Sequence, residues 1–380
     1  MRDERHNITL YGIGLCLYTI NNTALSLSLN GAVIIWLPWI GIIMMLIALT
    51  RTIGQHPIKT INDALSTDRF NRWYVLSCLV LALCMLISIR GTDLHVWGER
   101  CFVLAFACGG WLMGRRYGLP LFLPFIAFSV VVAVSVFAYC LATGWDDTGG
   151  IVSATNYDLA VAVLAMGTVF AMYGMDQWPN QKRILAIVIL VIAVGLNATM
   201  AAEALVALAA LMVIMALHNR WLLAGSVACI MIAGWLIQTS ISERTQEVQQ
   251  SIAAWGEGRV PAIKQAMHNA SSWGYGFSIN EYRLPSGGII AHNQLAAVLQ
   301  QSGALAAGAW LTTILTGLRY RYWGIVAMIV ALGLFDHLIW TALSPVWWAA
   351  MGAIAIEKYE EVPHDIQERK VAVDHIMEGC

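Results

Sequence analysis

Long apolar runs, separated by short polar segments, occupy most of this chain. The hydrocarbon core of a bilayer takes roughly 20 predominantly apolar residues of α-helix, so a run of about that length is typical of a membrane span. We therefore expect an all-α, polytopic membrane helix bundle with about twelve transmembrane helices. The predicted spans are 9–28, 31–50, 73–90, 96–114, 120–142, 156–174, 184–200, 201–217, 221–238, 291–314, 322–340 and 343–356.

The apolar run at 184–217 is long for one span and short for two. Asn197 and Glu203 lie in its middle, and polar or charged side chains are costly in hydrocarbon. A tight turn outside the membrane would expose both side chains. The pattern therefore favours two short helices joined by such a turn.

The basic residues fall in unequal numbers on the two sides of this layout. With the N-terminus in the cytoplasm, sixteen of the 22 basic residues lie inside and six outside, which is the asymmetry that the positive-inside rule predicts. Both chain ends are then cytoplasmic. The inner set is Arg2, Arg5, Arg51, Lys59, Arg69, Arg72, Arg115, Arg116, Lys182, Arg183, Arg220, Arg319, Arg321, Lys358, Arg369 and Lys370. The outer set is Arg90, Arg100, Arg244, Arg259, Lys264 and Arg283.

The same layout divides the chain into four regions. The first nine spans, a long polar loop outside the membrane, the last three spans and a solvated cytoplasmic tail occupy 1–238, 239–290, 291–356 and 357–380. The loop is the one sizeable polar segment between spans. It contains two stretches with a helical pattern, followed by a run of glycines and a proline that break the chain.

Composition supports a lipid-facing surface and excludes several classes of function. The chain is 59% hydrophobic and 12% charged, whereas a soluble domain is about 25% charged. The net charge of −1 argues against a nucleic-acid partner. The eight cysteines lack zinc-ligand spacing and lie mostly in apolar runs, so we interpret them as small hydrophobic residues.

Candidate chemistry gathers near the long loop. Four of the six outer basic residues lie in this loop, and arginine can bind phosphate oxygens in a bidentate manner. Four glutamates bring the net charge of the loop close to zero. The alternative is that these charged residues form ordinary solvated faces of surface helices. His292, at the start of the next span, could accept a proton from a sugar hydroxyl near neutral pH. The alternative is an interfacial histidine that hydrogen-bonds its neighbours. The four basic residues are Arg244, Arg259, Lys264 and Arg283.

Three further polar groups lie at predicted outer helix ends. Asp336 and His337 are adjacent in sequence, so any catalytic role for them needs other partners. Arg100 can bind an anion or simply pair with its neighbour Glu99. Motifs for zinc peptidases, serine hydrolases, P-loops and dinucleotide binding are absent from the sequence, as is an acidic cluster for a divalent metal, so we expect neither a metal nor a cofactor.

Several of these residues together resemble a known family. His292-Asn293, followed after nine residues by Gly303, is similar to the signature of the O-antigen ligase and Wzy polymerase family. Gly258-Arg259 with Ala266, Gly274 and Gly276 resembles that family's loop pattern, and Asn156 resembles the Asn that opens a middle span. The segment Asp336-His337-Leu338-Ile339-Trp340-Thr341 looks like its Asp-His-aromatic-Leu-Trp-Thr element. These matches cover about residues 150–350.

The chain departs from the family pattern at several positions. Ala306 replaces the second glycine of the Gly-x-x-Gly element, Ile263 replaces a tryptophan, and Ser272 replaces a proline. Many members carry a Ser-Arg pair where this chain has Ala201-Ala202 followed by Glu203. A second phosphate-binding arginine is therefore not carried over by the resemblance.

The resemblance implies a GT-C-like, metal-independent glycosyltransferase in the bacterial inner membrane, with its active site facing the periplasm. The donor would be an undecaprenyl-diphosphate-linked glycan, and for a ligase the acceptor would be lipid A–core. Arg259 would hold the diphosphate, and His292 would orient or deprotonate the acceptor hydroxyl. Asn293 would position neighbouring groups or cap the helix rather than react. The remaining candidates for substrate binding are Arg244, Lys264, Arg283, Arg100, His337 and Asp336.

Three alternatives stay open. Within the family, a repeat-unit polymerase is the nearest alternative to a ligase, and transfer to a protein acceptor is another. A polysaccharide-lipid transporter or flippase is the alternative from a different class. Transporters commonly place polar residues on broken helices in the middle of the membrane, whereas here they gather at predicted outer ends.

Overall fold

The computed structural model describes residues 2–20, 31–55, 69–88, 105–143, 157–174, 180–198, 202–236, 260–261, 263–268, 293–334 and 343–354. Nearly all of these residues are helical and none lies in a strand, which confirms the predicted all-α class for this part of the chain. Each of the twelve apolar runs overlaps a described helix. The helices are α1 (Arg2–Thr19), α3 (Gly31–Gln55), α5 (Arg69–Ser88), η2 (Ala105–Gly110), α7 (Trp111–Tyr117), η3 (Leu119–Phe122), α8 (Leu123–Thr143), α10 (Tyr157–Tyr173), α11 (Asn180–Ala198), α12 (Ala202–His218), α13 (Arg220–Leu236), α15 (Gln294–Gly317), α16 (Trp323–Gly333) and α17 (Ser344–Ile354).

The described helices differ in whether they are long enough to cross a bilayer. Two are long and apolar enough, over Trp36–Gly54 of α3 and Gln181–Ala198 of α11. A third span exists if the α7 and α8 regions count as one, although the chain bends there by 115°. Five further apolar stretches of the described helices have only 10–17 residues; α12, for example, has 17 residues, which at 1.5 Å per residue is about 25 Å.

Helices α3 and α5 are among those that carry apolar side chains on their exposed faces. On α5 these residues are spaced by three or four positions, so they form one stripe along the helix. A water-soluble surface rarely exposes a continuous apolar stripe of this kind. The stripe is therefore consistent with a helix that faces lipid. Its members are Trp73, Leu76, Leu79, Leu83 and Ile87, and the corresponding residues of α3 are Trp36, Trp39, Ile40, Ile43 and Ile47.

The run at 184–217 forms two helices, α11 and α12, as predicted. The expectation that Asn197 and Glu203 are exposed is wrong, because both side chains are buried. Asn197 Nδ2 donates to the Ala193 carbonyl oxygen at 2.7 Å, so its amide finds a partner within its own helix. Helices α8, α10, α12 and α13 also pack on α11, and this packing shields the end of the helix from solvent.

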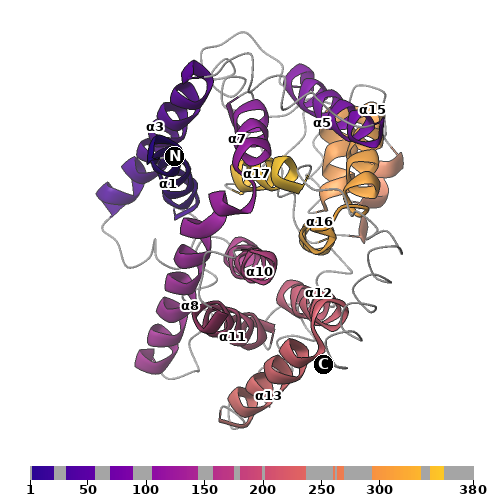
Figure 1. Cartoon of the computed structure of the whole chain (residues 1–380). Helices are drawn as coiled ribbons and strands as arrows, with labels where there is room; N and C mark the ends of the chain where they lie inside the picture. Colours follow the sequence, from indigo (N-terminus) through magenta and orange to yellow (C-terminus); the bar gives the residue numbers. More distant parts are fainter. Residues whose placement is uncertain are drawn as a thin grey trace, which may run out of the picture.

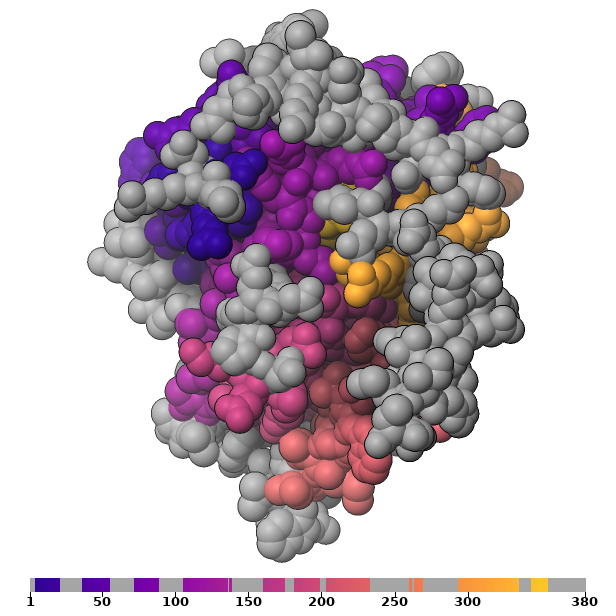
Figure 2. All heavy atoms as spheres, viewed as in Figure 1, coloured from indigo at the N-terminus to yellow at the C-terminus, as the bar shows by residue number. Residues whose placement is uncertain are grey.

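Helix α10 lies at the centre of the bundle, where it contacts α8, α11, α12 and α16 (Figure 1). The Phe122 and Phe170 rings stack with centroids 4.0 Å apart, and Phe125 meets Phe170 edge-on. Two further pairs, α1 with α3 and α5 with α15, pack beside this core. In the space-filling view α1 and α3 cover the upper left of the molecule, and α12 and α13 its lower part (Figure 2).

Helices α7 and α17 cross at very short range. A Cβ on Gly114 would collide with the Ala349 carbonyl oxygen, and one on Gly352 would collide with the Trp111 carbonyl oxygen. Gly110, the last residue of η2, and Gly114 of α7 are four residues apart in one helical stretch and therefore share a face. Small residues at this spacing let the backbones of membrane helices approach closely.

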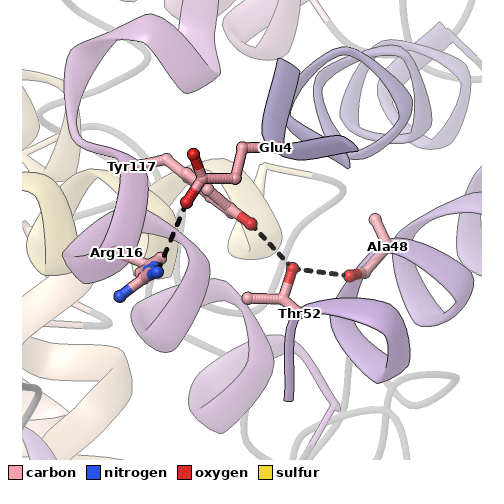
Figure 3. Close-up of polar contacts among 5 residues, drawn as sticks. All are labelled: Glu4, Ala48, Thr52, Arg116 and Tyr117. Atoms are coloured by element: carbon pink, nitrogen blue, oxygen red, sulfur yellow. Dashed lines mark hydrogen bonds and ion pairs between the residues drawn. The ribbon is translucent and has the colours of Figure 1, made fainter. Parts of the chain in front are cut away.

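Polar contacts join α1, α3 and α7 at one end of the bundle (Figure 3). Arg116 Nη2 lies 3.4 Å from Glu4 Oε1, and the Thr52 and Tyr117 hydroxyls are 2.9 Å apart. The Thr52 hydroxyl also donates to the Ala48 carbonyl oxygen at 2.8 Å. The start of α1, the end of α3 and the end of α7 all belong to the predicted cytoplasmic side, so their meeting agrees with the alternating layout.

A second group of helix ends meets around Tyr173. Its ring lies 5.0 Å from that of His218 and 5.7 Å from that of Tyr322, and its hydroxyl accepts the Gly324 N–H at 3.1 Å. These residues bring together the end of α10, the end of α12 and the start of α16. All three ends again belong to the predicted cytoplasmic side.

The pH dependence of stability should report on this second group. Partial burial, followed by the charges of Arg183 and Arg321, lowers the pKa of His218 below its usual 6.5. The unfolded chain then binds more protons than the folded chain below about pH 6.5, so stability should fall as the pH drops from there. Thermal unfolding between pH 8 and pH 5 should show this loss, and the His218→Gln variant should show less of it. An identical acid-side slope in the variant would contradict the assignment.

Candidate functional site

The candidate site is built around Asn293, because only two of the predicted site residues lie in the described part of the chain. These two are Asn293 and Lys264. The other seven fall outside the described residues: His292, Arg259, Arg244, Arg283, Arg100, Asp336 and His337. The geometry of the site therefore comes from the segments that flank them.

Asn293 caps α15 and ties it to α16. Its backbone is extended (φ −156°, ψ 128°), and its Oδ1 accepts the Ala296 N–H at 3.0 Å. This is the bond that makes Asn a favoured residue at a helix N-terminus. Its Nδ2 donates to the Leu334 carbonyl oxygen at 3.2 Å. One amide thus fixes the start of α15 against the residue that follows α16.

The long loop contributes a helical segment that packs on this helix start. Residues 263–268 are helical, and Ala266 forms a buried contact cluster with Ala296 on the first turn of α15. Ile263 packs against the same two alanines and so provides an apolar contact. Lys264 is exposed. The loop segment therefore lies against the helix turn that Asn293 caps.

The end of α16 lies against the same turn. A Cβ on Gly333 would lie 2.9 Å from Gln294 Cβ, so the backbones of α15 and α16 are close at this point. Together with the Asn293–Leu334 hydrogen bond, this contact fixes the two helices at a common level. The described residues 263–268, 293–296 and 333–334 thus converge, although up to about 70 positions separate them in sequence.

Helix α15 is broken at Gly303. The residue has φ 90° and ψ 178°, a conformation that is essentially restricted to glycine. The break also changes the direction of the helix. A straight helix from Gln294 to Gly317 would be about 34 Å long, but its two ends contact Gly333 and Val326, which lie only about 10 Å apart along α16. The segment before Gly303 must therefore fold back toward α16.

Polar side chains line the contact between α5 and α15. The Ser302 hydroxyl donates to the Ser88 hydroxyl at 3.2 Å, and the Thr313 hydroxyl donates to that of Ser77 at 2.8 Å. Three buried glutamines also lie on the segment before the break: Gln294, Gln300 and Gln301. We did not predict a role for them from the sequence, although three glutamines within one predicted span are the signal that could have indicated it, because glutamine is mostly exposed in folded proteins.

This arrangement positions three chain segments against one another. Within the described ranges, no group of three or more His, Cys, Asp or Glu side chains could hold a metal ion. The contacts that hold the three segments are the Asn293 amide, the alanine pair Ala266 and Ala296, and the close approach of Gly333 to Gln294. No family model matches this chain, and neither a curated protein nor a solved structure matches it.

Proposed function

We propose that this chain is an O-antigen ligase-like glycosyltransferase of the inner membrane, with about twelve spans and a GT-C-like bundle. It would transfer a glycan from undecaprenyl diphosphate to lipid A–core on the periplasmic face. One observation carries the proposal: residues 263–268, Asn293 and Leu334 converge at one end of α15. Each of these belongs to, or directly flanks, one of the three elements that resemble the family.

Covalent continuity links this convergence to the predicted catalytic residues. Consecutive Cα atoms are about 3.8 Å apart. His292 directly precedes Asn293, and Asp336 follows Leu334 by two positions. Arg259 directly precedes the helical residues 260–261. Each predicted residue is thus only a few positions from residues that pack together. Such short connections are required if the three elements share one site.

The proposed reaction is a single displacement at the anomeric carbon of the first sugar. The acceptor hydroxyl oxygen forms the new bond to that carbon, and His292 accepts the hydroxyl proton. The bond from the anomeric carbon to the diphosphate oxygen breaks, and its electron pair leaves with undecaprenyl diphosphate. Arg259 stabilises the charge that develops on this leaving group. Because the diphosphate leaves as an anion, the step needs no general acid.

Arg259→Lys should lower transfer sharply. Lysine keeps the positive charge but loses the planar fork that binds two phosphate oxygens at once. We expect a loss of tenfold or more in the rate of transfer by membranes that contain equal amounts of protein. Arg51→Lys is the matched control, since Arg51 is exposed near the end of α3 on the predicted cytoplasmic side. Wild-type rates with Arg259→Lys would mean that Arg259 does not hold the diphosphate.

A lipopolysaccharide gel from a deletion strain of the native host tests the function and separates its two closest forms. Core lipid without polymer, with glycan accumulating on its carrier, indicates a ligase. Core that bears a single repeat unit indicates a repeat-unit polymerase. An unchanged ladder would reject both substrates and leave a protein acceptor or a transported lipid to be considered.

A polysaccharide-lipid transporter is a second candidate, because α15 is broken at Gly303 among buried polar side chains. Broken helices of this kind form the substrate sites of many transporters. An uptake assay in proteoliposomes distinguishes the two functions. Robust movement of the lipid-linked glycan without transfer to an acceptor would replace the enzyme proposal with the transporter.

A further inference from the structure

Gln301 has a buried side-chain amide that makes no hydrogen bond within the described bundle. It is 1% exposed, and neither its Oε1 nor its Nε2 has a hydrogen-bond partner among the described residues. It lies two positions before the break at Gly303, and next to Ser302, whose hydroxyl contacts Ser88 at the end of α5. The neighbouring Gln300 is equally buried but does interact with another residue.

A buried amide without a hydrogen-bond partner destabilises the folded chain. Methionine would fill nearly the same volume as Gln301 without a polar group. Local departures of this kind from the most stable choice are expected where a site serves function.

The chemistry of the amide restricts what it can bind. Nε2 offers two donors and Oε1 accepts, so the group complements a neutral partner that both donates and accepts hydrogen bonds. A phosphate presents only acceptors near neutral pH, and Oε1 would face it unfavourably. Hydroxyl and acetamido groups of a sugar satisfy both halves of the amide.

Gln301 lies near the predicted outer end of the bundle. The segment from Gln294 to Ser302 folds back toward α16, and its first turn carries the cap of Asn293. Ser88, the last residue of α5, contacts Ser302 and so marks the end of that predicted span. The break therefore lies at the same end of the bundle as Asn293, where the carrier's first sugar would lie.

We propose that Gln301 hydrogen-bonds a hydroxyl or acetamido group of the sugar that is attached to the diphosphate, and so helps to select the glycan. This inference rests on the proposed function. In this inference Gln301 binds the glycan, whereas Arg259 binds the diphosphate. The break at Gly303 would place the amide beside the sugar.

The test uses Gln301→Met in the full chain, reconstituted in lipid nanodiscs. Thermal unfolding is measured alone, with undecaprenyl diphosphate, and with undecaprenyl-diphosphate-linked glycan extracted from the deletion strain. For the wild type we expect a larger stabilisation by the glycan-bearing lipid than by the bare carrier. Gln301→Met should unfold at the wild-type temperature or above when alone, keep the response to the bare carrier and lose the additional response to the glycan. Its transfer rate should fall tenfold or more.

Gln300→Met is the matched control, because it removes an equally buried amide that does interact. It should unfold at a lower temperature with or without either lipid. Two results would overturn the inference: a lower unfolding temperature of Gln301→Met alone, since the amide would then be bonded within the protein, or an unchanged additional response to the glycan. A wild type that responds to neither lipid would instead reject the proposed function, and this inference with it.

Discussion

Gly114→Ala is expected to prevent the protein from accumulating in the membrane in folded form. The new methyl group would overlap the Ala349 carbonyl oxygen, with the Ala349 carbonyl carbon 2.8 Å and the Ala353 nitrogen 2.9 Å from Cβ. All three neighbours are backbone atoms, so no side chain can rotate to make room. Overpacking of a well-packed core typically costs about 1–3 kcal/mol and sometimes more, and here α7 and α17 would have to separate.

Gly308→Ala is the matched control for this prediction. Gly308 lies within α15, and a Cβ there would meet nothing within 4 Å. Alanine should therefore be tolerated and can add about 1 kcal/mol of helix stability. The measurement is the fraction of a fluorescent fusion that elutes as a single species after detergent extraction. Equal profiles for Gly114→Ala and Gly308→Ala would contradict the close packing of α7 and α17.

His292→Ala is expected to lower the rate of glycan transfer by about 10²–10⁴, which is the usual contribution of a general base. In the proposed mechanism, the acceptor hydroxyl would lose the group that takes its proton as the new bond forms. The fold should survive, because the α15 cap is made by the Asn293 side chain and not by His292. Transfer rates per amount of membrane protein, together with thermal unfolding, measure the two effects separately.

His268→Ala is the control for His292→Ala. His268 is exposed on the loop segment that packs against α15, so its loss removes an imidazole from the same region without touching the proposed base. We expect wild-type transfer with this variant. If His292→Ala reaches the membrane normally and transfers glycan at the wild-type rate, His292 has a structural role and the proposed mechanism is wrong.

Much of the helical framework could be predicted from the sequence, because a hydrophobic run of span length has few other structures available. The break of 184–217 into α11 and α12 was predicted from the position of its polar residues. The burial of Asn197 and Glu203 was not, since it depends on neighbouring helices and on a hydrogen bond within α11. Tertiary packing of this kind leaves no pattern in the local sequence.

The candidate site also has features that the sequence indicated and contacts that only the structure shows. The sequence placed His292 and Asn293 at a helix start, whereas Gly303 was noted only in the family resemblance and the break there was not predicted. The contact of Ala266 with Ala296 carries no such signal, because alanine is common on every helix face. The bond from Asn293 to Leu334 ends on a backbone carbonyl, which every residue possesses. The structure was therefore needed to show that the loop, α15 and the end of α16 meet.

The most direct test of the central claim is transfer by the purified protein in nanodiscs. The reaction contains undecaprenyl-diphosphate-linked glycan and lipid A–core, without nucleotide and with a metal chelator. We predict that lipid A–core gains the glycan while undecaprenyl diphosphate is released in equal amount. An unchanged donor and acceptor, with protein that is folded and binds the lipid-linked glycan, would contradict the assignment of this chain as a glycosyltransferase.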